Sequence, residues 1–436
     1  MAWKQWALSL GYVGVAAVLS PWLYVRRRRG KPIGCLYEKC TGAVQVERSQ
    51  DPAVWWHGVS VGEILLLRPL VRAFGQRFPG RQQVVSATTP TGLELARREF
   101  ADLPVIPWPF DFVWAVRRAL DRVRPELLVL AELELWPNLL VEAGRRGIPV
   151  AIVNARLSER SFRRYFPLRH WLREALVAVH LVAAQNETYA RRFAQLGIAP
   201  ARIHVTGSVK FDSGTSANDC EKLHQFRTWL AVRPGQTIWV VGSTQAPEEA
   251  MALRIFAKLR RSHPGLRLVL VPRHRERFEE VASSIRSMGL TWARRSEHPT
   301  TLTGTEQVVL WDTLGELRVL WGLADVAFVG GSLADRGGQN MIEPAAFGVA
   351  PVFGPHVWNF QDIAQGLLAA GGALQVADAA DWEEVTRRLL SDPAYRRTLG
   401  ARARCFVQSH AGATQRTLDL LVPLLAAKGC GTARAA

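Results

Sequence analysis

The sequence contains few cysteines, and their placement argues against a disulfide framework and against a structural zinc site. The five cysteines are scattered and odd in number, with no CxxC pair and no histidine at ligand spacing. We therefore expect a reduced compartment and no structural zinc. Cys35 and Cys40 are close in sequence, but two thiols alone make a poor metal site.

Acidic residues are also scarce. Thirty-eight Asp and Glu stand against 55 Lys and Arg, which gives a formal net charge of +17 at pH 7. This excess favours anionic partners such as nucleic acid, anionic lipid or a phosphorylated substrate. No DxD-like or His-rich cluster follows a predicted strand, so a metal clamp on a phosphate has no support. Lysine, arginine and helix amides would meet a leaving phosphate instead.

No long stretch is poor enough in apolar residues to stay disordered, and no tandem repeat is visible. A chain of 436 residues exceeds what one hydrophobic core usually organises, so we expect two domains of roughly 200 residues each.

The segment from Gln5 to Val25 carries no charge. As a helix rising about 1.5 Å per residue, it would just span a hydrocarbon core of about 30 Å. Aromatic residues near both of its ends and four arginines directly after it predict a membrane anchor, with the rest of the chain on the cytoplasmic face. A cleaved signal peptide is disfavoured because the basic cluster follows the apolar run. A monotopic anchor stays open, because glycine and serine dilute the apolarity.

After this segment, short apolar runs alternate with longer amphipathic stretches, such as Glu63–Phe78 and Thr91–Phe100. This pattern predicts βαβ units and two doubly wound α/β domains. The predicted strands are Val54–His57, Gln83–Ser86, Leu127–Leu130, Val150–Val153, Leu181–Ala183, Thr237–Val241, Leu266–Val271, Val308–Leu310, Val326–Val329 and Ala350–Phe353.

A polar segment rich in small residues, from Gly207 to Asn218, predicts the domain boundary. We expect an anchor over residues 1–30, an N-terminal domain over 31–212 and a C-terminal domain over 213–436. Ligands of open parallel sheets bind beyond the carboxyl ends of the strands, so site residues are expected in the loops that follow strands.

The first such loop, HGVSVGE, ends on Glu63, which begins a helix. The simpler interpretation, which we favour from this motif alone, is that Glu63 complements the helix dipole, a contribution of about 0.3–1 kcal/mol. The functional interpretation is a general base that removes the proton of an attacking hydroxyl.

The stretch AELELWPNLL places Glu132 at the end of a very apolar strand, where a lone buried charge is costly, so we expect it to face a site. Glu134 precedes a predicted helix start and is interpreted as a contributor to its cap. The next loop, NARLSERS, brings Arg156 and Arg160 to the same edge. These arginines suit phosphate oxygens, although surface ion pairs are an equal alternative.

Loops of the second half also suit an anion. Lys210 lies at the predicted hinge, and Arg273 follows a strand where a nucleotide phosphate or base would dock. The most specific stretch is GGSLADRGGQNMIEPAAFG, whose glycines let backbone amides and a helix N-terminus approach an anion. Glu343, early in that helix, is placed to hold ribose hydroxyls.

Together these segments resemble the Kdo transferases, which move 3-deoxy-D-manno-octulosonic acid (Kdo) from CMP-Kdo to the lipid A precursor in Gram-negative bacteria. The resemblance is collinear over nearly the whole chain. It runs through HGVSVGE, TTPTGLELAR, ELELWPNLL, NARLSERS, AAQNE, TGSVKFD, GSTQAPEE, LVPRHRERF, DTLGEL, ADVAFVGGS, GGQNMIEPAA and GPHVWNFQDI.

The resemblance implies a GT-B fold: two Rossmann-like domains and an interdomain cleft, with acceptor on the N-terminal domain and donor on the C-terminal one. It implies that Glu63 is the proton acceptor and that Glu132 and Lys210 stabilise the transition state. It further implies an inverting transfer at the inner membrane without metal, cofactor or nucleic acid. The residues that would hold CMP are Pro272, Arg273, Leu314, Gly315, Glu316, Asn340, Met341, Ile342 and Glu343.

Three departures from the family pattern stand out. Gln245 and Gln339 occupy positions where the family usually carries histidine, and GCLYEKCTG lacks the usual Trp-Gly-Glu-Arg-like run. Glutamine exchanges hydrogen bonds but carries no charge, so donor affinity is the property that these replacements would affect. Acceptor docking near the membrane would be affected by the third.

Three alternatives remain at this stage. Another GT-B glycosyltransferase with a different nucleotide sugar is the nearest, because fold alone does not settle substrate. A nucleic-acid-binding protein would explain the charge, but no recognisable motif supports it. A non-catalytic scaffold is disfavoured by the intact Glu63, Glu132 and Lys210.

Overall fold

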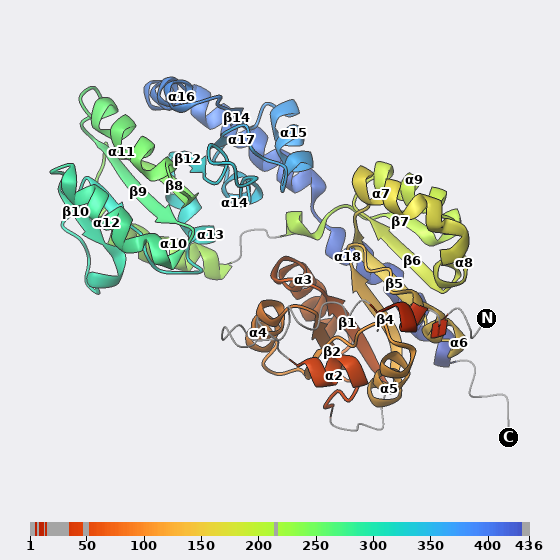
Figure 1. Cartoon of the computed structure of the whole chain (residues 1–436). Coiled ribbons are helices and arrows are strands. Elements are labelled where there is room, and N and C mark those ends of the chain that lie inside the picture. Colours follow the sequence, from red (N-terminus) through yellow and green to blue (C-terminus); the bar gives the residue numbers. More distant parts are fainter. Residues whose placement is uncertain are drawn as a thin grey trace. The chain divides into compact units, whose positions relative to one another are not determined.

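The computed structural model describes residues 5, 6, 8–12, 14, 35–46, 52–212 and 217–429. The chain divides into two compact units, Met1–Asp212 with Ala411–Ala436 and Ser213–His410, called here the first and second unit. Each contains a seven-stranded parallel sheet with helices on both faces (Figure 1). The predicted pair of doubly wound, Rossmann-like α/β domains is therefore confirmed.

The sheet of the first unit has the order β3-β2-β1-β4-β5-β6-β7. The chain runs outward from β1 to β3 and then returns to place β4 on the other side of β1, so the switch point lies between β1 and β4. The strands are β1 (Ala53–Gly58), β2 (Gln82–Ala87), β3 (Val105–Pro107), β4 (Pro125–Ala131), β5 (Val150–Ala155), β6 (Val179–Ala184) and β7 (Ile203–Val205).

Every residue of β1, β4 and β5 is buried, as expected for strands covered on both faces. Side chains of α3, α4 and α18 pack on one face, and those of α5, α6, α8 and α9 on the other. The helices are α2 (Leu36–Thr41), α3 (Val61–Arg77), α4 (Pro90–Glu99), α5 (Val113–Val123), α6 (Pro137–Arg145), α7 (Glu159–Tyr165), η1 (Phe166–Leu168), α8 (Arg169–Val177), α9 (Glu187–Leu196), η2 (Pro200–Arg202), η3 (Val209–Asp212) and α18 (Ala413–Gly429).

The second unit repeats this scheme with the order β10-β11-β9-β8-β12-β13-β14, so β8 and β12 correspond to β1 and β4. Its strands are β8 (Thr237–Thr244), β9 (Leu266–Pro272), β10 (Trp292–Arg294), β11 (Val308–Leu310), β12 (Val326–Val329), β13 (Pro351–Phe353) and β14 (Leu374–Gln375). Its helices are α10 (Ala217–Trp229), α11 (Glu248–Leu259), η4 (Arg275–Arg277), α12 (Phe278–Ser287), η5 (Arg295–Glu297), α13 (Leu317–Leu320), η6 (Trp321–Leu323), α14 (Ile342–Ala346), α15 (Gln361–Ala369), α16 (Ala379–Ser391) and α17 (Pro393–His410).

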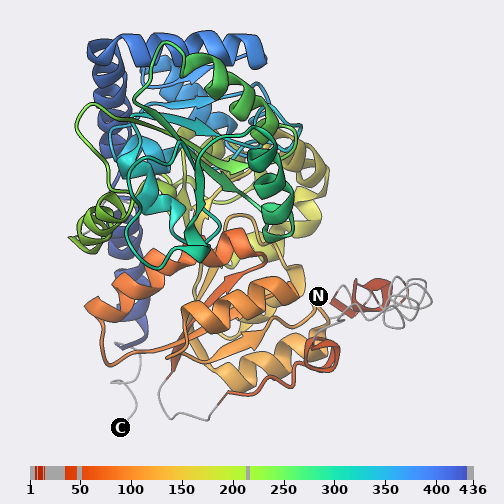
Figure 2. The same ribbon diagram turned by 90° about the vertical axis from the view of Figure 1, so that its left-hand side faces the viewer.

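The last helix differs from the sequence-based domain assignment, which placed residues 213–436 in one domain. α18 packs on the first unit beside α3 (Figure 2). Its residues Leu418, Leu421 and Leu425 are buried there. Asp212 fixes its start by accepting backbone N–H groups of residues 412–414, the first of them at 2.6 Å. The amphipathic sequence of a terminal helix predicts that it packs on a core, but not on which one.

The described residues at the start of the predicted anchor contact the first unit through polar groups. Gln5 Nε2 donates to Glu142 Oε1 at 3.1 Å, and Arg145 donates to Gln5 Oε1 at 2.5 Å. The Oγ of the fully buried Ser9 accepts the N–H of Val113 at 3.1 Å. The greater part of the predicted anchor lies outside the described residues. In the part of the chain that the structure does describe, no helix combines the length and apolarity needed to cross a membrane.

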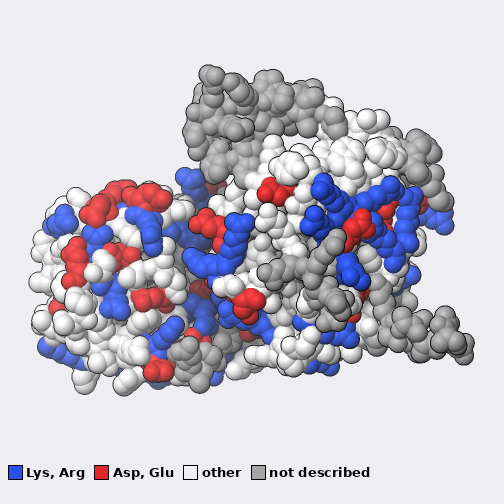
Figure 3. Space-filling model, turned by 90° about the horizontal axis from the view of Figure 1, so that it is seen from below, with Lys and Arg blue, Asp and Glu red and all other residues white. Residues whose placement is uncertain are grey.

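On the face seen in Figure 3, basic side chains are interspersed with acidic ones rather than gathered in one stripe. Many charged side chains of the described residues form ion pairs, such as Arg192 with Glu159 at 2.7 Å and Lys258 with Glu383 at 2.8 Å.

Candidate active site

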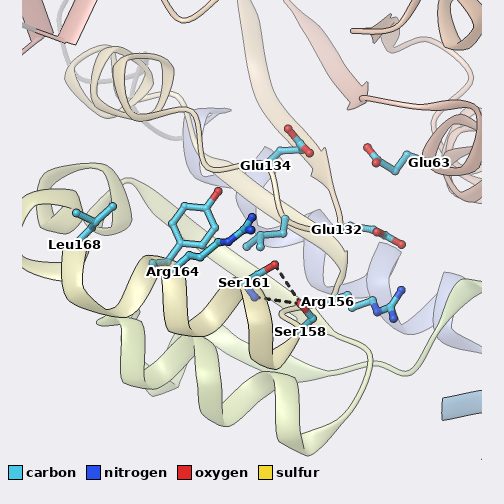
Figure 4. A pocket seen from close by; sticks show the side chains of 10 residues that line it. Glu63, Glu132, Glu134, Arg156, Ser158, Ser161, Arg164 and Leu168 are labelled. Carbon is cyan, nitrogen blue, oxygen red and sulfur yellow. Dashed lines mark hydrogen bonds between the residues drawn. The ribbon is translucent and has the colours of Figure 1, made fainter. Parts of the chain in front are cut away.

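A pocket of about 650 Å³ opens in the first unit beyond the carboxyl ends of β1, β4 and β5. Three acidic, two basic and several hydroxyl-bearing side chains face it (Figure 4). It lies beside the switch point of the sheet, where open α/β sheets bind ligands. The lining residues are Glu63, Glu132, Leu133, Glu134, Arg156, Ser158, Ser161, Arg164, Tyr165 and Leu168.

Glu63 lies in the first turn of α3, directly after the β1 loop. Its Oε2 accepts the N–H of Val59 at 2.5 Å, and its Oε1 accepts the hydroxyl of Ser60 at 3.3 Å. A Cβ at Gly58 would come within 3.0 Å of the Glu63 Cβ, so glycine allows this close approach. Burial raises the pKa of Glu63 to about 7, against the opposing effect of the Val59 N–H. A carboxyl that titrates near neutral pH suits a general base.

Glu132 follows β4, and its N–H donates to the carbonyl of Val153 at 3.0 Å. Its φ of +57° lies in the left-handed region, which residues other than glycine rarely adopt. The chain leaves the sheet at this turn, and the side chain lines the pocket. Strain of this kind is often found at functional sites. The structure thus brings Glu63 and Glu132 to one pocket.

Glu134 also lines the pocket, and its interpretation as a helix cap is wrong. Asp111 binds the first amides of α6 instead, accepting the N–H of Asn138 at 3.0 Å and of Leu139 at 2.9 Å. Glu134 Oε2 accepts the indole N–H of Trp136 at 2.7 Å. Burial and then the neighbouring Glu63 raise the pKa of Glu134 to about 8. The signal for this residue was its spacing of two from Glu132 at a strand end.

Lys210 lies in η3 and is not among the side chains that line the pocket. η3 packs on α3, the helix that begins beside Glu63. Asn154 fixes η3 through its Oδ1, which accepts the N–H of Val209 at 3.1 Å, while Gln185 donates to the Asn154 carbonyl at 2.9 Å. The buried Asn154, with a φ of +49°, therefore joins three strand-end loops.

Two arginines bring positive charge to the pocket. Arg156 lines it as expected for a strand-end loop, whereas the predicted Arg160 is exposed outside it. Arg164, which the sequence analysis did not single out, lines the pocket instead. Ser158 caps α7 by accepting the N–H of Ser161 at 3.2 Å. The pocket can therefore hold an anionic molecule near a carboxylate base.

The residues predicted to hold CMP all lie in the second unit, beyond the carboxyl ends of its strands. Pro272 and Arg273 end and follow β9, residues 314–316 follow β11, and residues 340–343 follow β12. These strands lie in the central part of one parallel sheet, so the three loops share one edge. No group of three or more potential metal-ligating side chains occurs within the described ranges.

The glycine-rich loop after β12 is held by a residue that the sequence analysis did not single out. Glu248, fully buried at the start of α11, accepts the N–H of Gln245 at 2.9 Å. It also accepts four successive amides of the loop, from Gly331 at 2.7 Å to Ala334 at 3.3 Å. A Cβ at Gly331 would lie 3.3 Å from the side-chain Nε2 of Gln245 and 3.5 Å from the side-chain Nε2 of Gln339. Both replaced histidine positions therefore meet at this glycine.

Two acidic residues of the predicted CMP site are bound within their own loops. Glu316 accepts the indole N–H of Trp311 at 2.8 Å and the hydroxyl of Thr313. Glu343 accepts the amide of Asn340 at 3.1 Å, and burial raises its pKa. These contacts fix the loops, while the contact of Glu343 with a ribose stays a prediction.

Two Rossmann-like units, each with a seven-stranded parallel sheet, are typical of the GT-B fold. The fold is shared with UDP-GlcNAc 2-epimerase from Neisseria meningitidis bound to UDP-GlcNAc, at a TM-score of 0.60 and 14% identity over 85% of this chain and all of that one. A glycosyltransferase from Rickettsia africae is similar at a TM-score of 0.56 and 11% identity, covering 86% of this chain and 99% of that chain.

Sequence comparison narrows this class. Residues 35–213 match the model of the family described as 3-deoxy-D-manno-octulosonic-acid transferase (kdotransferase). The chain is 37% identical to 3-deoxy-D-manno-octulosonic acid transferase from Bordetella pertussis, over 95% of this chain and 97% of that one. The chain is also 37% identical to the Haemophilus influenzae protein of the same name, over 85% of this chain and 87% of that one. The chain belongs to the Kdo transferase family, and the resemblance inferred from its motifs is confirmed.

Proposed function

We propose that this protein transfers Kdo from CMP-Kdo to a lipid A precursor in lipopolysaccharide biosynthesis, by an inverting and metal-independent reaction. Family membership supports the donor sugar and the reaction type. The observation that carries the chemistry is the position of Glu63, which combines an open pocket, a helix N-terminus and a pKa of about 7. A glutamate that only complemented the helix dipole would not require this pocket.

The proposed step is one displacement at the anomeric carbon of Kdo. The acceptor hydroxyl gives its proton to the Glu63 carboxylate, its oxygen forms the new bond to the sugar, and the bond from the sugar to the CMP phosphate oxygen breaks. CMP leaves with the electron pair. A single carboxylate base is sufficient, because the leaving phosphate is already a stable anion.

Other residues would bind and stabilise charge. We assign transition-state stabilisation to Glu132 and Lys210, since a carboxylate favours a developing positive charge on the ring and an ammonium favours the leaving phosphate. Arg156 and Arg164 suit an anionic acceptor. On the second unit, the loop bound by Glu248 and the residues after β9 and β11 are assigned to CMP.

We further propose attachment to the bacterial inner membrane through the N-terminal segment, with both units on the cytoplasmic face. The uncharged run from Gln5 to Val25 and the arginines after it support this. Membranes from expressing cells should retain the full chain after washing with high salt and release it in detergent. Recovery in the salt wash would contradict an apolar anchor.

The transfer itself is tested with purified, detergent-solubilised protein, CMP-Kdo and a tetraacyl lipid A precursor. Mass spectrometry of the lipid should show the addition of one or more Kdo units without added metal and in the presence of a chelator. Binding of CMP without any product would contradict the proposed acceptor. A product formed only with added divalent metal would contradict the metal-independent step.

A further inference from the structure

The first unit places more acidic charge in its pocket than one base requires. Three glutamates line it: Glu63, which follows β1, and Glu132 and Glu134, which both follow β4. Within the described residues, none of the three forms an ion pair with a lysine or arginine. Three carboxylates that share a partly buried pocket without such partners cannot all ionise at little cost.

Hydrogen bonding separates the roles of Glu63 and Glu134. Glu63 receives a backbone N–H and a hydroxyl, and both contacts stabilise its ionised form. Glu134 receives one indole N–H, from Trp136, on Oε2, and its Oε1 has no partner among the described residues. Figure 4 shows the two carboxyl groups pointing toward one another. A proton shared by this pair is therefore held more readily on Glu134.

We propose that Glu134 is a positioning residue that keeps one proton in the pocket and thereby leaves Glu63 as the ionised base. The inference rests on the proposed role of Glu63 in Kdo transfer. Glu134 itself takes no proton from the acceptor, because it enters and leaves the transfer step as a neutral acid. Its role is to avoid adding a further negative charge beside Glu63 and Glu132.

The remaining charged and titratable groups of the pocket are compatible with this assignment. Tyr165 is neutral at physiological pH, because burial and the nearby Glu134 raise its pKa. Arg156 and Arg164 line the pocket on the α7 side, and Glu132 completes the acidic group. The pKa of Glu134, raised by burial and by Glu63 to about 8, lies above that of Glu63, at about 7, as the hydrogen bonding predicts.

The neutral acid has a close mimic in Glu134→Gln, which keeps an oxygen for the Trp136 indole and cannot ionise. Glu159→Gln is the matched control, because Glu159 is an exposed carboxylate on α7, next to the pocket-lining Ser158, and does not line the pocket itself. Both proteins should fold, which circular dichroism and thermal melting will show.

Infrared difference spectroscopy of the substrate-free protein at pH 7 tests the proton directly. Wild type minus Glu134→Gln should show the carbonyl band of a protonated carboxylic acid, and wild type minus Glu159→Gln should not. Bands of other carboxyls with a raised pKa, such as Asp111, cancel in these differences. Absence of the band from the first difference spectrum would overturn the proposal. This readout needs no turnover, so it decides the proposal even if the proposed Kdo transfer fails.

The pH dependence of kcat/KM gives the second test. Glu134→Gln should still transfer Kdo at pH 7, because its amide is neutral like the protonated acid that it replaces. The wild type and Glu159→Gln should lose kcat/KM above about pH 8, where Glu134 ionises and repels an anionic acceptor, whereas Glu134→Gln should not. A folded Glu134→Gln protein that is inactive at every pH would show that the carboxylate charge itself is needed. An alkaline decline identical to that of wild type would show that another group titrates, and either result would overturn the proposal.

Discussion

Glu63 and Glu248 occupy corresponding places in the two units, each at the start of the helix that follows the first strand of its sheet. Both accept a backbone N–H from the loop before their own helix. Glu248 is fully buried and accepts five such groups, so its carboxylate is committed to holding a loop. Glu63 accepts one N–H and a hydroxyl and faces an open pocket.

This difference shows how one position in a repeated βα unit serves two purposes. In the second unit the carboxylate accepts four successive backbone amides and so holds the loop after β12 in place. In the first unit the carboxylate is available to accept a proton. The surroundings of the side chain decide its role, because both glutamates occupy the same place at the start of a helix that follows a strand.

The largest expected effect that separates the two residues is on turnover. Glu63→Gln should lower kcat for Kdo transfer by about 10²–10⁴-fold, because an amide cannot accept the proton of the acceptor hydroxyl. CMP affinity and the melting temperature should stay close to those of wild type. Initial rates, titration calorimetry with CMP and thermal melting measure the three quantities. Substantial turnover by the variant would remove Glu63 from its assigned role.

Glu248→Gln should instead act on stability. The amide leaves several of the five bound N–H groups without an acceptor, which should lower the free energy of unfolding of the second unit by about 3 kcal/mol. Because the loop after β12 loosens, CMP binding should weaken as well. Chemical denaturation of this variant and of Glu63→Gln compares their free energies of unfolding. Equal stability of the two variants would contradict the distinction drawn between them.

A smaller effect on CMP binding is expected at the carboxyl end of β9 in the second unit. Arg273→Ala should weaken CMP binding by about tenfold, equivalent to about 1.4 kcal/mol. Arg275→Ala is the control, because Arg275 is an exposed arginine of the neighbouring η4. Titration calorimetry should separate the two variants. Equal CMP affinity in both would contradict the placement of CMP next to β9.

The smallest effect concerns stability and pH. Burial raises the pKa of Glu63 to about 7 from an unfolded value of about 4.3. The folded protein therefore binds the proton more tightly, and ionisation of Glu63 lowers stability as pH rises through this window. The melting temperature of Glu63→Gln minus that of wild type should therefore be larger at pH 8 than at pH 5. No change in this difference between the two pH values would contradict a raised pKa.

The fold was predictable where strands are buried on both faces. All ten predicted strands form, because central parallel strands require continuous apolar runs. The four that were missed, β3, β7, β10 and β14, are the edge strands of the two sheets. An edge strand pairs on one side only and is short, so it leaves no strong apolar signal. The position of α18 on the first unit could not be predicted either, because it depends on tertiary contacts with α3 and Asp212.

Sequence motifs identified the candidate site more completely than physical reasoning from single residues. Glu63 and Glu132 were found as strand-end carboxylates and do meet in one pocket. Glu134 was misjudged, because Asp111, 23 residues earlier in the sequence, caps the helix in its place. Glu248 was overlooked, since its partners lie more than 80 residues away. Both errors arise from contacts between loops that are distant in sequence.

The pH dependence of kcat/KM on the acid side tests most directly whether the pocket of the first unit provides the base. The measurement uses wild-type protein, CMP-Kdo and a tetraacyl lipid A precursor between pH 5 and pH 8. Transfer should rise as one group loses a proton near pH 7, in accord with the raised pKa of Glu63. A rate that stays constant down to pH 5 would contradict the account.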